Sequence, residues 1–293
     1  MLNVRNINKT IEDKKVLHDI SFSLTAGTIT GLIGRNGTGK TTILKTIAGI
    51  LDPTSGDITF NNLSIQKHPS EKVNFVYVSD STQFLNSYTP NEIAKLYISI
   101  YPTFDFELFK SLMSRFQLPL KKIRSYSKGM KAQLAIILAF SSRVSLVLLD
   151  EPTNGLDPIV KRQILQFIVE EVAVHNVAVL ISTHHLNEIE QIADQVILLR
   201  DGKVDLVASI EDAKERYVKV QAVFKNELPE RLTLQENITV LGKIGRVYTL
   251  LINDSISQTY ALIEAEHPLL LEEIPMTLED IFVILLGGDD YVS

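Results

Sequence analysis

The fold is decided by the stretch Gly34-Arg35-Asn36-Gly37-Thr38-Gly39-Lys40-Thr41-Thr42, which matches the P-loop pattern. A short apolar run with β-branched residues precedes it at 29–33, and a segment with a helical pattern follows it at 41–50. The order strand, glycine-rich turn and helix is the context that this pattern requires. A glycine-rich turn that contains a lysine by coincidence is therefore the weaker interpretation.

The glycines of this loop allow successive backbone N–H groups to curl around phosphate oxygens, and the helix that follows adds the positive end of its dipole. Lys40 is expected to reach the β- and γ-phosphates, and the Thr41 hydroxyl is expected to bind Mg²⁺. The predicted nucleotide-binding residues of the loop are Gly34, Asn36, Gly37, Thr38, Gly39, Lys40, Thr41 and Thr42.

A second motif is an apolar run at 144–149 that ends in two adjacent carboxylates, Asp150 and Glu151. This is the Walker B arrangement of P-loop ATPases, in which the first carboxylate holds Mg²⁺. Glu151 is the predicted general base, since it can polarise the water that attacks the γ-phosphate. An acidic pair at a strand end is often only a solvated turn, but the P-loop upstream favours the functional interpretation.

A further apolar run lies at 177–181, and a helix-like stretch at 158–174 separates it from the 144–149 run. Apolar runs of this kind are typical of a parallel sheet that helices cover on both faces. His184 follows the 177–181 run, so it is predicted to lie at the same sheet edge as the phosphate loop and to contact the γ-phosphate. A single histidine is more often a surface or core residue, and His185 is the weaker candidate.

Two other regions differ from this βα rhythm. Helical segments broken by prolines lie between 89 and 116, and they predict a helical insertion over about 81–135. The rhythm stops after about residue 213, where strand patterns at 218–225, 238–240 and 246–252 indicate a small antiparallel unit. The predicted domains are 1–215, an α/β nucleotide-binding domain with a mixed, largely parallel sheet, and 216–293, a small α+β accessory or dimerisation domain.

Composition restricts the possible functions. The chain has 293 residues, a net charge of −6 and no cysteine, which excludes disulfides and thiolate metal sites. No basic patch is visible, so we expect no nucleic-acid partner. The first residues alternate apolar and polar side chains rather than forming a signal segment. A membrane span needs about 20 mostly apolar residues, and runs such as 134–140 are much shorter. The chain is not expected to form a pore by itself.

A third motif, Ser125-Tyr126-Ser127-Lys128-Gly129-Met130-Lys131, precedes the Walker B run. It resembles the Leu-Ser-Gly-Gly-Gln signature of ATP-binding cassette (ABC) ATPases. Ser127 and the second glycine, Gly129, are kept, whereas Tyr126, Lys128 and Met130 replace the other positions. This variant is similar to that of ABC-2-type exporters of peptides and antibiotics. The resemblance covers residues 1 to about 215.

The resemblance also includes Asn154-Gly155-Leu156-Asp157, which is similar to the D-loop of the family. It implies ATP and Mg²⁺ as ligands and a head-to-tail dimer, with a second copy or a related ATPase, that sandwiches ATP. Ser127 and Gly129 would face the γ-phosphate bound by the other subunit, and Asp157 would couple the two sites. It further implies a transmembrane permease subunit as partner, so the chain would lie in the cytoplasm, on the inner face of the membrane.

Two positions depart from the family pattern. An aromatic residue usually stacks on adenine near the end of the first strand, and Ile11 stands at that position, so stacking is reduced. The Q-loop glutamine is replaced by Asp80, which can still bind Mg²⁺ but adds negative charge beside it. Gln83 is an alternative residue for this role.

The expected function is an ATP-hydrolysing subunit that powers export of an antimicrobial or cytolytic peptide or an antibiotic, with lipid or polysaccharide as the alternative cargo. A soluble, non-transport ABC ATPase is the alternative class. A cytosolic P-loop kinase would need neither the signature nor the D-loop. The segment 276–282 is similar to the ending of many ABC-2 exporter ATPases, and an amphipathic closing helix with Leu278, Ile281 and Phe282 facing a core explains it equally well.

Overall fold

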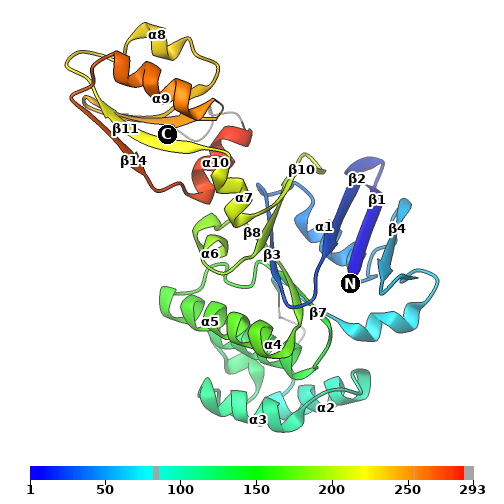
Figure 1. The fold of residues 1–293 in the computed structure, drawn as a ribbon. Helices are drawn as coiled ribbons and strands as arrows, with labels where there is room; N and C mark the ends of the chain where they lie inside the picture. The colour runs from blue at the N-terminus through cyan, green and yellow to red at the C-terminus, as the bar shows by residue number, and fades with distance from the viewer. Residues whose placement is uncertain (82–85, 254, 287–293) are drawn as a thin grey trace. The chain divides into compact units, whose positions relative to one another are not determined.

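The computed structural model describes residues 1–81, 86–253 and 255–286. The chain forms two compact units, 1–207 and 208–293, and Figure 1 shows the course of the chain through both. The boundary predicted after residue 215 coincides with the end of α7 (Ile210–Glu215), whereas the two units divide between Val207 and Ala208. Each unit is described separately below.

A six-stranded sheet is the centre of the first unit, with the order β10-β9-β3-β8-β7-β6. The four strand pairs from β9 across to β6 are parallel. Every residue of β3, β7 and β8 is buried, as expected for strands that are covered on both faces. The strands are β3 (Ile29–Ile33), β6 (Phe75–Val78), β7 (Leu146–Asp150), β8 (Ala178–Thr183), β9 (Gln195–Arg200) and β10 (Lys203–Ser209).

A smaller antiparallel sheet with the order β2-β1-β4-β5 completes the β-structure of this unit. One hydrophobic core connects the two sheets through α1, since Leu2 and Phe60 pack in the same cluster as Ile43, Leu44 and Leu148. The strands are β1 (Leu2–Ile11), β2 (Lys14–Leu24), β4 (Ser55–Phe60) and β5 (Leu63–Ser64). The α/β fold with a mixed, largely parallel sheet is therefore confirmed.

Four helices of the first unit, α2 to α5, begin at residues whose side chains cap them, whereas α1 and α6 have no side-chain cap. Thr89 forms a reciprocal capping box with Glu92, and Asp105, Ser127 and Asp157 each accept backbone N–H groups. The segment predicted to be a helical insertion contains α2 and α3. The elements are α1 (Lys40–Ile47), η1 (Pro69–Asn74), α2 (Pro90–Ile100), α3 (Phe106–Arg115), η3 (Ile123–Ser125), α4 (Lys128–Ser141), α5 (Pro158–His175) and α6 (Leu186–Glu190).

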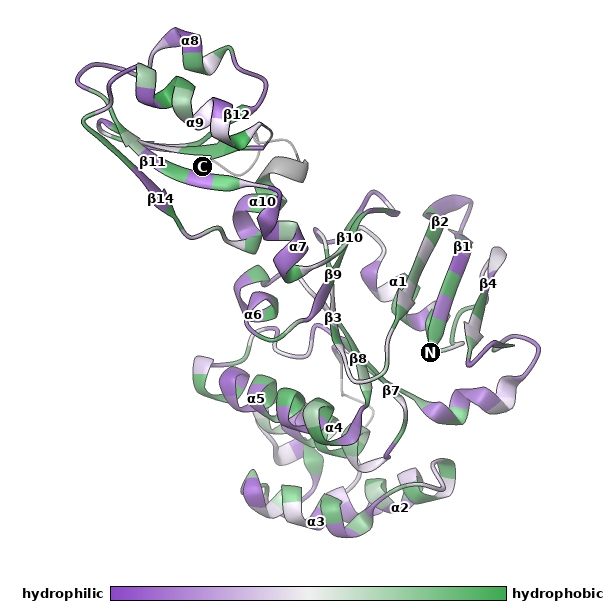
Figure 2. Ribbon diagram, in the orientation of Figure 1, coloured by the Kyte–Doolittle hydropathy of each residue, from purple (hydrophilic) through white to green (hydrophobic). Residues whose placement is uncertain are grey.

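The second unit contains an antiparallel sheet with the order β12-β13-β11-β14. Alternate residues of its inner strands, such as Val220, Ala222 and Leu250, are buried in one cluster with Ile263 of α9. Figure 2 shows both hydrophobic and hydrophilic positions along β11. The elements are β11 (Val218–Val223), α8 (Glu230–Thr233), β12 (Ile238–Ile244), β13 (Val247–Ile252), α9 (Ile256–Ala265), β14 (Leu270–Ile274) and α10 (Leu278–Leu286).

The segment that resembles an exporter ending forms the start of α10. Leu278, Ile281 and Phe282 are all buried, which supports the amphipathic-helix interpretation. Asp280 accepts from the Thr277 hydroxyl and also forms an ion pair of 2.8 Å with Lys219 of β11. The motif therefore fixes the last helix to the sheet of its own unit. None of the helices in the described ranges is long and apolar enough to cross a membrane.

Candidate functional site

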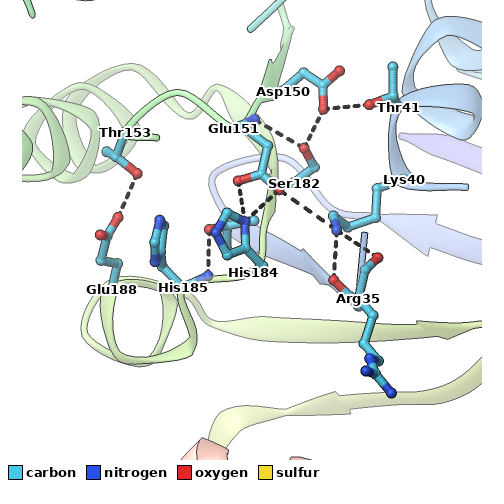
Figure 3. A network of polar contacts seen from close by, with 12 residues as sticks. Arg35, Lys40, Thr41, Asp150, Glu151, Thr153, Ser182, His184, His185 and Glu188 are labelled. Atoms are coloured by element: carbon cyan, nitrogen blue, oxygen red, sulfur yellow. Dashed lines mark hydrogen bonds and ion pairs between the residues drawn. The ribbon is translucent and has the colours of Figure 1, made fainter. Parts of the chain in front are cut away.

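The predicted site lies at the carboxyl edge of the six-stranded sheet. Ile33 is in register with Thr183, and Asp150 is in register with Ser182, so the loops that follow β3, β7 and β8 leave the sheet side by side. Figure 3 shows the polar side chains that these loops bring together. These side chains converge because parallel strands end at the same edge of the sheet, so the loops that follow them lie next to one another.

The phosphate loop depends on glycine at several positions. Gly37 and Gly39 have φ angles of 84° and 103°, in the left-handed region that other residues rarely adopt. A Cβ atom at Gly34 would lie 2.4 Å from the carbonyl oxygen of Leu199 in β9, so any side chain there would displace the loop. Gly39 is also the N-cap residue of α1, which directs the positive helix end toward the loop.

Lys40 is buried at the first turn of α1, with 6% of its side chain exposed. Its Nζ donates to the carbonyl oxygens of Gly34 and Arg35 at 2.6 and 3.1 Å, and it lies 3.7 Å from Oε1 of Glu151. Burial lowers the pKa of Lys40, and the nearby carboxylates of Glu151 and Asp150 partly oppose that shift. This ammonium group is therefore held by loop carbonyls and by the predicted general base.

Asp150 is 1% exposed and accepts three hydroxyl hydrogen bonds. Thr41 Oγ1 and Ser182 Oγ donate to its Oδ1 at 3.1 and 2.6 Å, and Tyr77 OH donates to its Oδ2 at 2.9 Å. Burial and the charge of Asp150 raise the pKa of Tyr77, so its hydroxyl remains a donor. Three neutral donors orient the carboxylate without neutralising it, as a cation site requires.

This donor set fits Mg²⁺, which prefers oxygen ligands and is usually bound by one or two carboxylates together with substrate phosphates. Asp150 and Thr41 would supply the oxygens. No group of three or more histidine, aspartate or glutamate side chains suited to a metal occurs in the described part of the chain. The described side chains at this edge therefore do not form a complete metal site by themselves. Nucleotide phosphate would have to complete the coordination of Mg²⁺.

Glu151 has a φ angle of 49°, which turns the chain sharply after β7. Its backbone N–H donates to the Ser182 hydroxyl at 3.1 Å, and its carboxylate lies 2.9 Å from Nδ1 of His184. The side chain is 13% exposed, and that of His184 is 36% exposed. Glu151 thus lies between Lys40 and His184, where a carboxylate could accept a proton from a water molecule that contacts the phosphate.

The signature residues lie around the start of α4, where Lys128 lines the same small cleft as Glu151. Ser127 is the exposed N-cap of α4, where its hydroxyl accepts from Met130 N, and Tyr126 donates to the carbonyl oxygen of Pro119. A Cβ atom at Gly129 would lie 3.3 Å from Val160 of α5. Among the described residues, no recorded contact joins Ser127 or Gly129 to the Lys40 and Asp150 network.

The other predicted site residues are dispersed. Ile11 is 38% exposed at the end of β1. Asp80 follows β6 and lines a small cleft together with Lys128 of the signature and Glu151. Thr42 lies in α1, whereas Asp157 caps α5 through two backbone N–H groups at 3.1 Å. Gln83 lies outside the described residues.

The sequence analysis missed three residues of this site. Tyr77 and Ser182 hold Asp150, and Glu188 contacts Thr153 and Lys161 on two neighbouring segments. Tyr77 and Ser182 do lie at the ends of apolar runs beside recognised motifs. No sequence pattern pairs them with Asp150, because strand order and register create those contacts.

Comparisons with known proteins identify the family of this chain. The family model described as "ABC transporter" matches residues 17–154. The ABC transporter ATP-binding protein YtrB of Bacillus subtilis is 37% identical over 290 residues, which cover 98% of this chain and 99% of that protein. The lantibiotic transport ATP-binding protein SrtF of Streptococcus pyogenes is 26% identical, with 78% of this chain and 97% of that protein covered.

A solved structure titled "Structure of ATP binding subunit of ABC transporter" is 28% identical, with a TM-score of 0.68 over 73% of this chain and 92% of its own. The relationship to YtrB extends over the second unit as well as the first, so both units belong to one family architecture. This chain therefore belongs to the ATP-binding subunits of ABC transporters, and it is an ABC transporter ATPase.

Proposed function

We propose that this subunit hydrolyses ATP to power export of a peptide or antibiotic through a separate membrane protein. The observation that carries the proposal is the convergence of Lys40, Asp150, Glu151 and His184 at one sheet edge. This arrangement combines a cation for phosphate, a carboxylate suited to Mg²⁺ and a carboxylate suited to activating water.

The role of each residue follows from its contacts. ATP phosphates would take the place of the Gly34 and Arg35 carbonyls and of Glu151 around the Lys40 ammonium group. Glu151 would then be free to accept a proton from water, while His184 orients its carboxylate. When bound, Mg²⁺ would neutralise charge on the phosphate oxygens. Positioning and electrostatic stabilisation would account for most of the rate enhancement.

We further propose that two cassettes pair head to tail. Ser127 at the N-cap of α4 is exposed, and its hydroxyl accepts from its own helix, so we assign the signature that would reach this ATP to a second subunit. A helix N-terminus stabilises an approaching anion. Asp157, at the start of α5, would couple the two ATP sites when the cassettes pair.

The membrane partner would dock on the helical insertion. A cleft of about 520 Å³ lies there, and its lining includes Phe106, Met113 and Leu118. Leu120 at its border is 63% exposed. We propose that a cytoplasmic helix of the permease covers this apolar surface and that Asp80 relays its movement to the site. The subunit would thus lie on the cytoplasmic face of the membrane, held there by its partner.

Export of a peptide or antibiotic is supported by two observations. The signature carries the Tyr126-Ser127-Lys128-Gly129-Met130 variant, and the relative SrtF is named for lantibiotic transport. Lipid or polysaccharide is the alternative cargo. The experiment that separates them is ATP-dependent accumulation in inside-out vesicles that contain this subunit and its co-expressed permease. Accumulation of a lantibiotic but not of a labelled lipid or polysaccharide supports the peptide proposal.

The test of the motor assignment is ATP turnover by the purified chain and by its Glu151→Gln variant, alone and with the co-expressed permease. We expect turnover to fall by about 10²–10⁴-fold, with ATP binding retained and the closed dimer accumulating. Glu107→Gln is the matched control, because Glu107 is 82% exposed on α3. Loss of ATP binding in Glu151→Gln would contradict the assigned role, and failure to copurify with any membrane protein would contradict the docking proposal.

A further inference from the structure

Glu188 of α6 connects two other segments of the first unit. Its Oε2 accepts from the Thr153 hydroxyl at 2.5 Å, and its Oε1 lies 2.7 Å from Nζ of Lys161. Each carboxylate oxygen therefore has a partner of its own. Figure 3 shows the contact between Thr153 and Glu188, together with His184 and His185, which lie just before α6.

These three residues are close in sequence to three residues of the site. Thr153 lies two positions after Glu151, Lys161 lies in the first turn of the helix that Asp157 caps, and Glu188 lies one helical turn after His184. The Glu188 contacts therefore tie the loop after β7 and the start of α5 to the turn after β8. A second link between the same two loops is the contact of His184 with Glu151.

Because these residues are largely buried, their contacts stabilise the positions of the two segments. Thr153 is 2% exposed, and the Glu188 and Lys161 side chains are 18% and 22% exposed. Hydrogen bonds to charged groups contribute more than neutral ones, and removing one partner from a mostly buried pair leaves the other poorly solvated. Loss of the carboxylate would release both segments together.

We propose that Glu188 is a positioning residue for hydrolysis, which holds the His184 turn against the loop 151–157 so that His184 and Glu151 keep their pairing. The inference rests on the proposed roles of Glu151 and His184. Glu188 itself would not contact ATP. The two partners of Glu188, Thr153 and Lys161, both lie outside the phosphate loop at 34–42, so nucleotide binding should be separable from the rate of the chemical step.

The experiment is steady-state ATP hydrolysis by the full chain and six variants. Glu188→Ala removes both contacts, and we expect kcat to fall by about 10- to 100-fold because the catalytic groups lose their alignment. The KM for ATP should stay within about twofold. Glu188→Gln can still accept from Lys161 and donate to the Thr153 hydroxyl, so it should recover most of the lost kcat. Asn187→Ala is the matched control, since Asn187 is exposed in the same helix.

Thr153→Val supplies the second test with almost no change in volume. Because it removes the Oε2 contact alone, kcat should fall, and the double variant with Glu188→Ala should be no slower than Glu188→Ala. It also keeps the inference testable if Glu188→Ala fails to fold. The inference is wrong if Glu188→Ala or Thr153→Val leaves kcat unchanged, or if kcat and KM change in parallel. Glu151→Gln in the same assay separates failure of this inference from failure of the proposed function. Unchanged turnover in Glu151→Gln would contradict the proposed function itself.

Discussion

The two edges of the six-stranded sheet both carry charged clusters, and the clusters differ in construction. At the carboxyl edge, Lys40 and Asp150 are almost completely buried; Lys40 donates to carbonyl oxygens of the phosphate loop, and Asp150 accepts from hydroxyls of α1, β6 and β8. At the amino edge, Arg143 pairs with Glu171 at 3.1 Å and with Asp105 at 3.6 Å, and the arginine is 25% exposed.

The difference between the two edges indicates how a functional charged cluster can be distinguished from a structural one. The amino-edge charges lie at helix ends and pair with one another, so they fasten α3, α4 and α5 together. The lining of a cavity of about 240 Å³ beside them includes Arg143, Glu171 and His175 together with apolar residues of α4 and β7. The carboxyl-edge charges instead lie where β7 ends and α1 begins. Apart from the Lys40–Glu151 pair, their partners are neutral carbonyl and hydroxyl groups that a ligand could replace. Variants at both edges test this distinction.

The largest effect is expected for Lys40→Met. The change keeps the side-chain volume but removes the ammonium group that would bind phosphate, so ATP hydrolysis should fall by about 10²–10³-fold. The fold should persist, because burial already disfavours the charged lysine. Hydrolysis and urea unfolding would be measured together, with Lys45→Met in the same helix as control. Cooperative unfolding with near-normal hydrolysis would show that the carboxyl edge is not the phosphate site.

Asp150→Asn is expected to have the next largest effect. The hydroxyls of Thr41, Ser182 and Tyr77 can rotate to accept as well as donate, so stability should change by no more than about 1.5 kcal/mol. The Mg²⁺ concentration needed for half-maximal hydrolysis should rise about tenfold or more. A titration of Mg²⁺ at saturating ATP measures this. An unchanged Mg²⁺ requirement would remove Asp150 from the proposed cation site.

Arg143→Met tests the amino edge. Because Arg143→Met leaves the mostly buried Glu171 carboxylate without this partner, the free energy of unfolding should fall by about 1–3 kcal/mol, and ATP turnover should stay within about twofold. The urea midpoint provides the stability measurement, and Arg124→Met, at an exposed position, is the control. A large loss of turnover with intact stability would mean that the amino edge also takes part in function.

The smallest effect concerns pH. Burial lowers the pKa of His185 from its ordinary value; His184 and Lys161 act in the same direction, whereas Glu188 and Glu151 oppose them. A lowered folded-state pKa means that the unfolded chain binds more protons, so the His185 contribution is present above the ordinary pKa of 6.5 and is lost as pH falls below it. Thermal unfolding between pH 5 and pH 8 should show a weaker pH dependence for His185→Gln. An identical slope would contradict this assignment.

Much of the site could be predicted because its motifs carry their own geometry. Glycine at 37 and 39 is needed for positive φ angles, so the loop that contains Lys40 is recognisable from residue type alone. Apolar runs ending in Asp150 and just before His184 predict parallel strands with polar loops at one edge. The position of these elements in the structure agrees with that prediction.

Other contacts depend on distances that no motif encodes. Tyr77 reaches Asp150 because β6 pairs with β7, and Ser182 reaches it because Asp150 and Ser182 are register partners. The edge strand β10 and its neighbour β9, the sheet β2-β1-β4-β5 beyond its first strand, and α9 lie outside the motifs that predicted the fold.

The sequence by itself determined the phosphate loop, the Walker B pair, the signature segment and the βα order, because each follows from local backbone conformation or from the period of apolar residues. The tertiary structure alone decided which hydroxyls hold Asp150, that Glu151 lies between Lys40 and His184, and that Glu188 fastens two neighbouring segments. The reason is physical: a hydrogen bond between residues far apart in the chain exists only after strand order and register bring their atoms within about 3 Å.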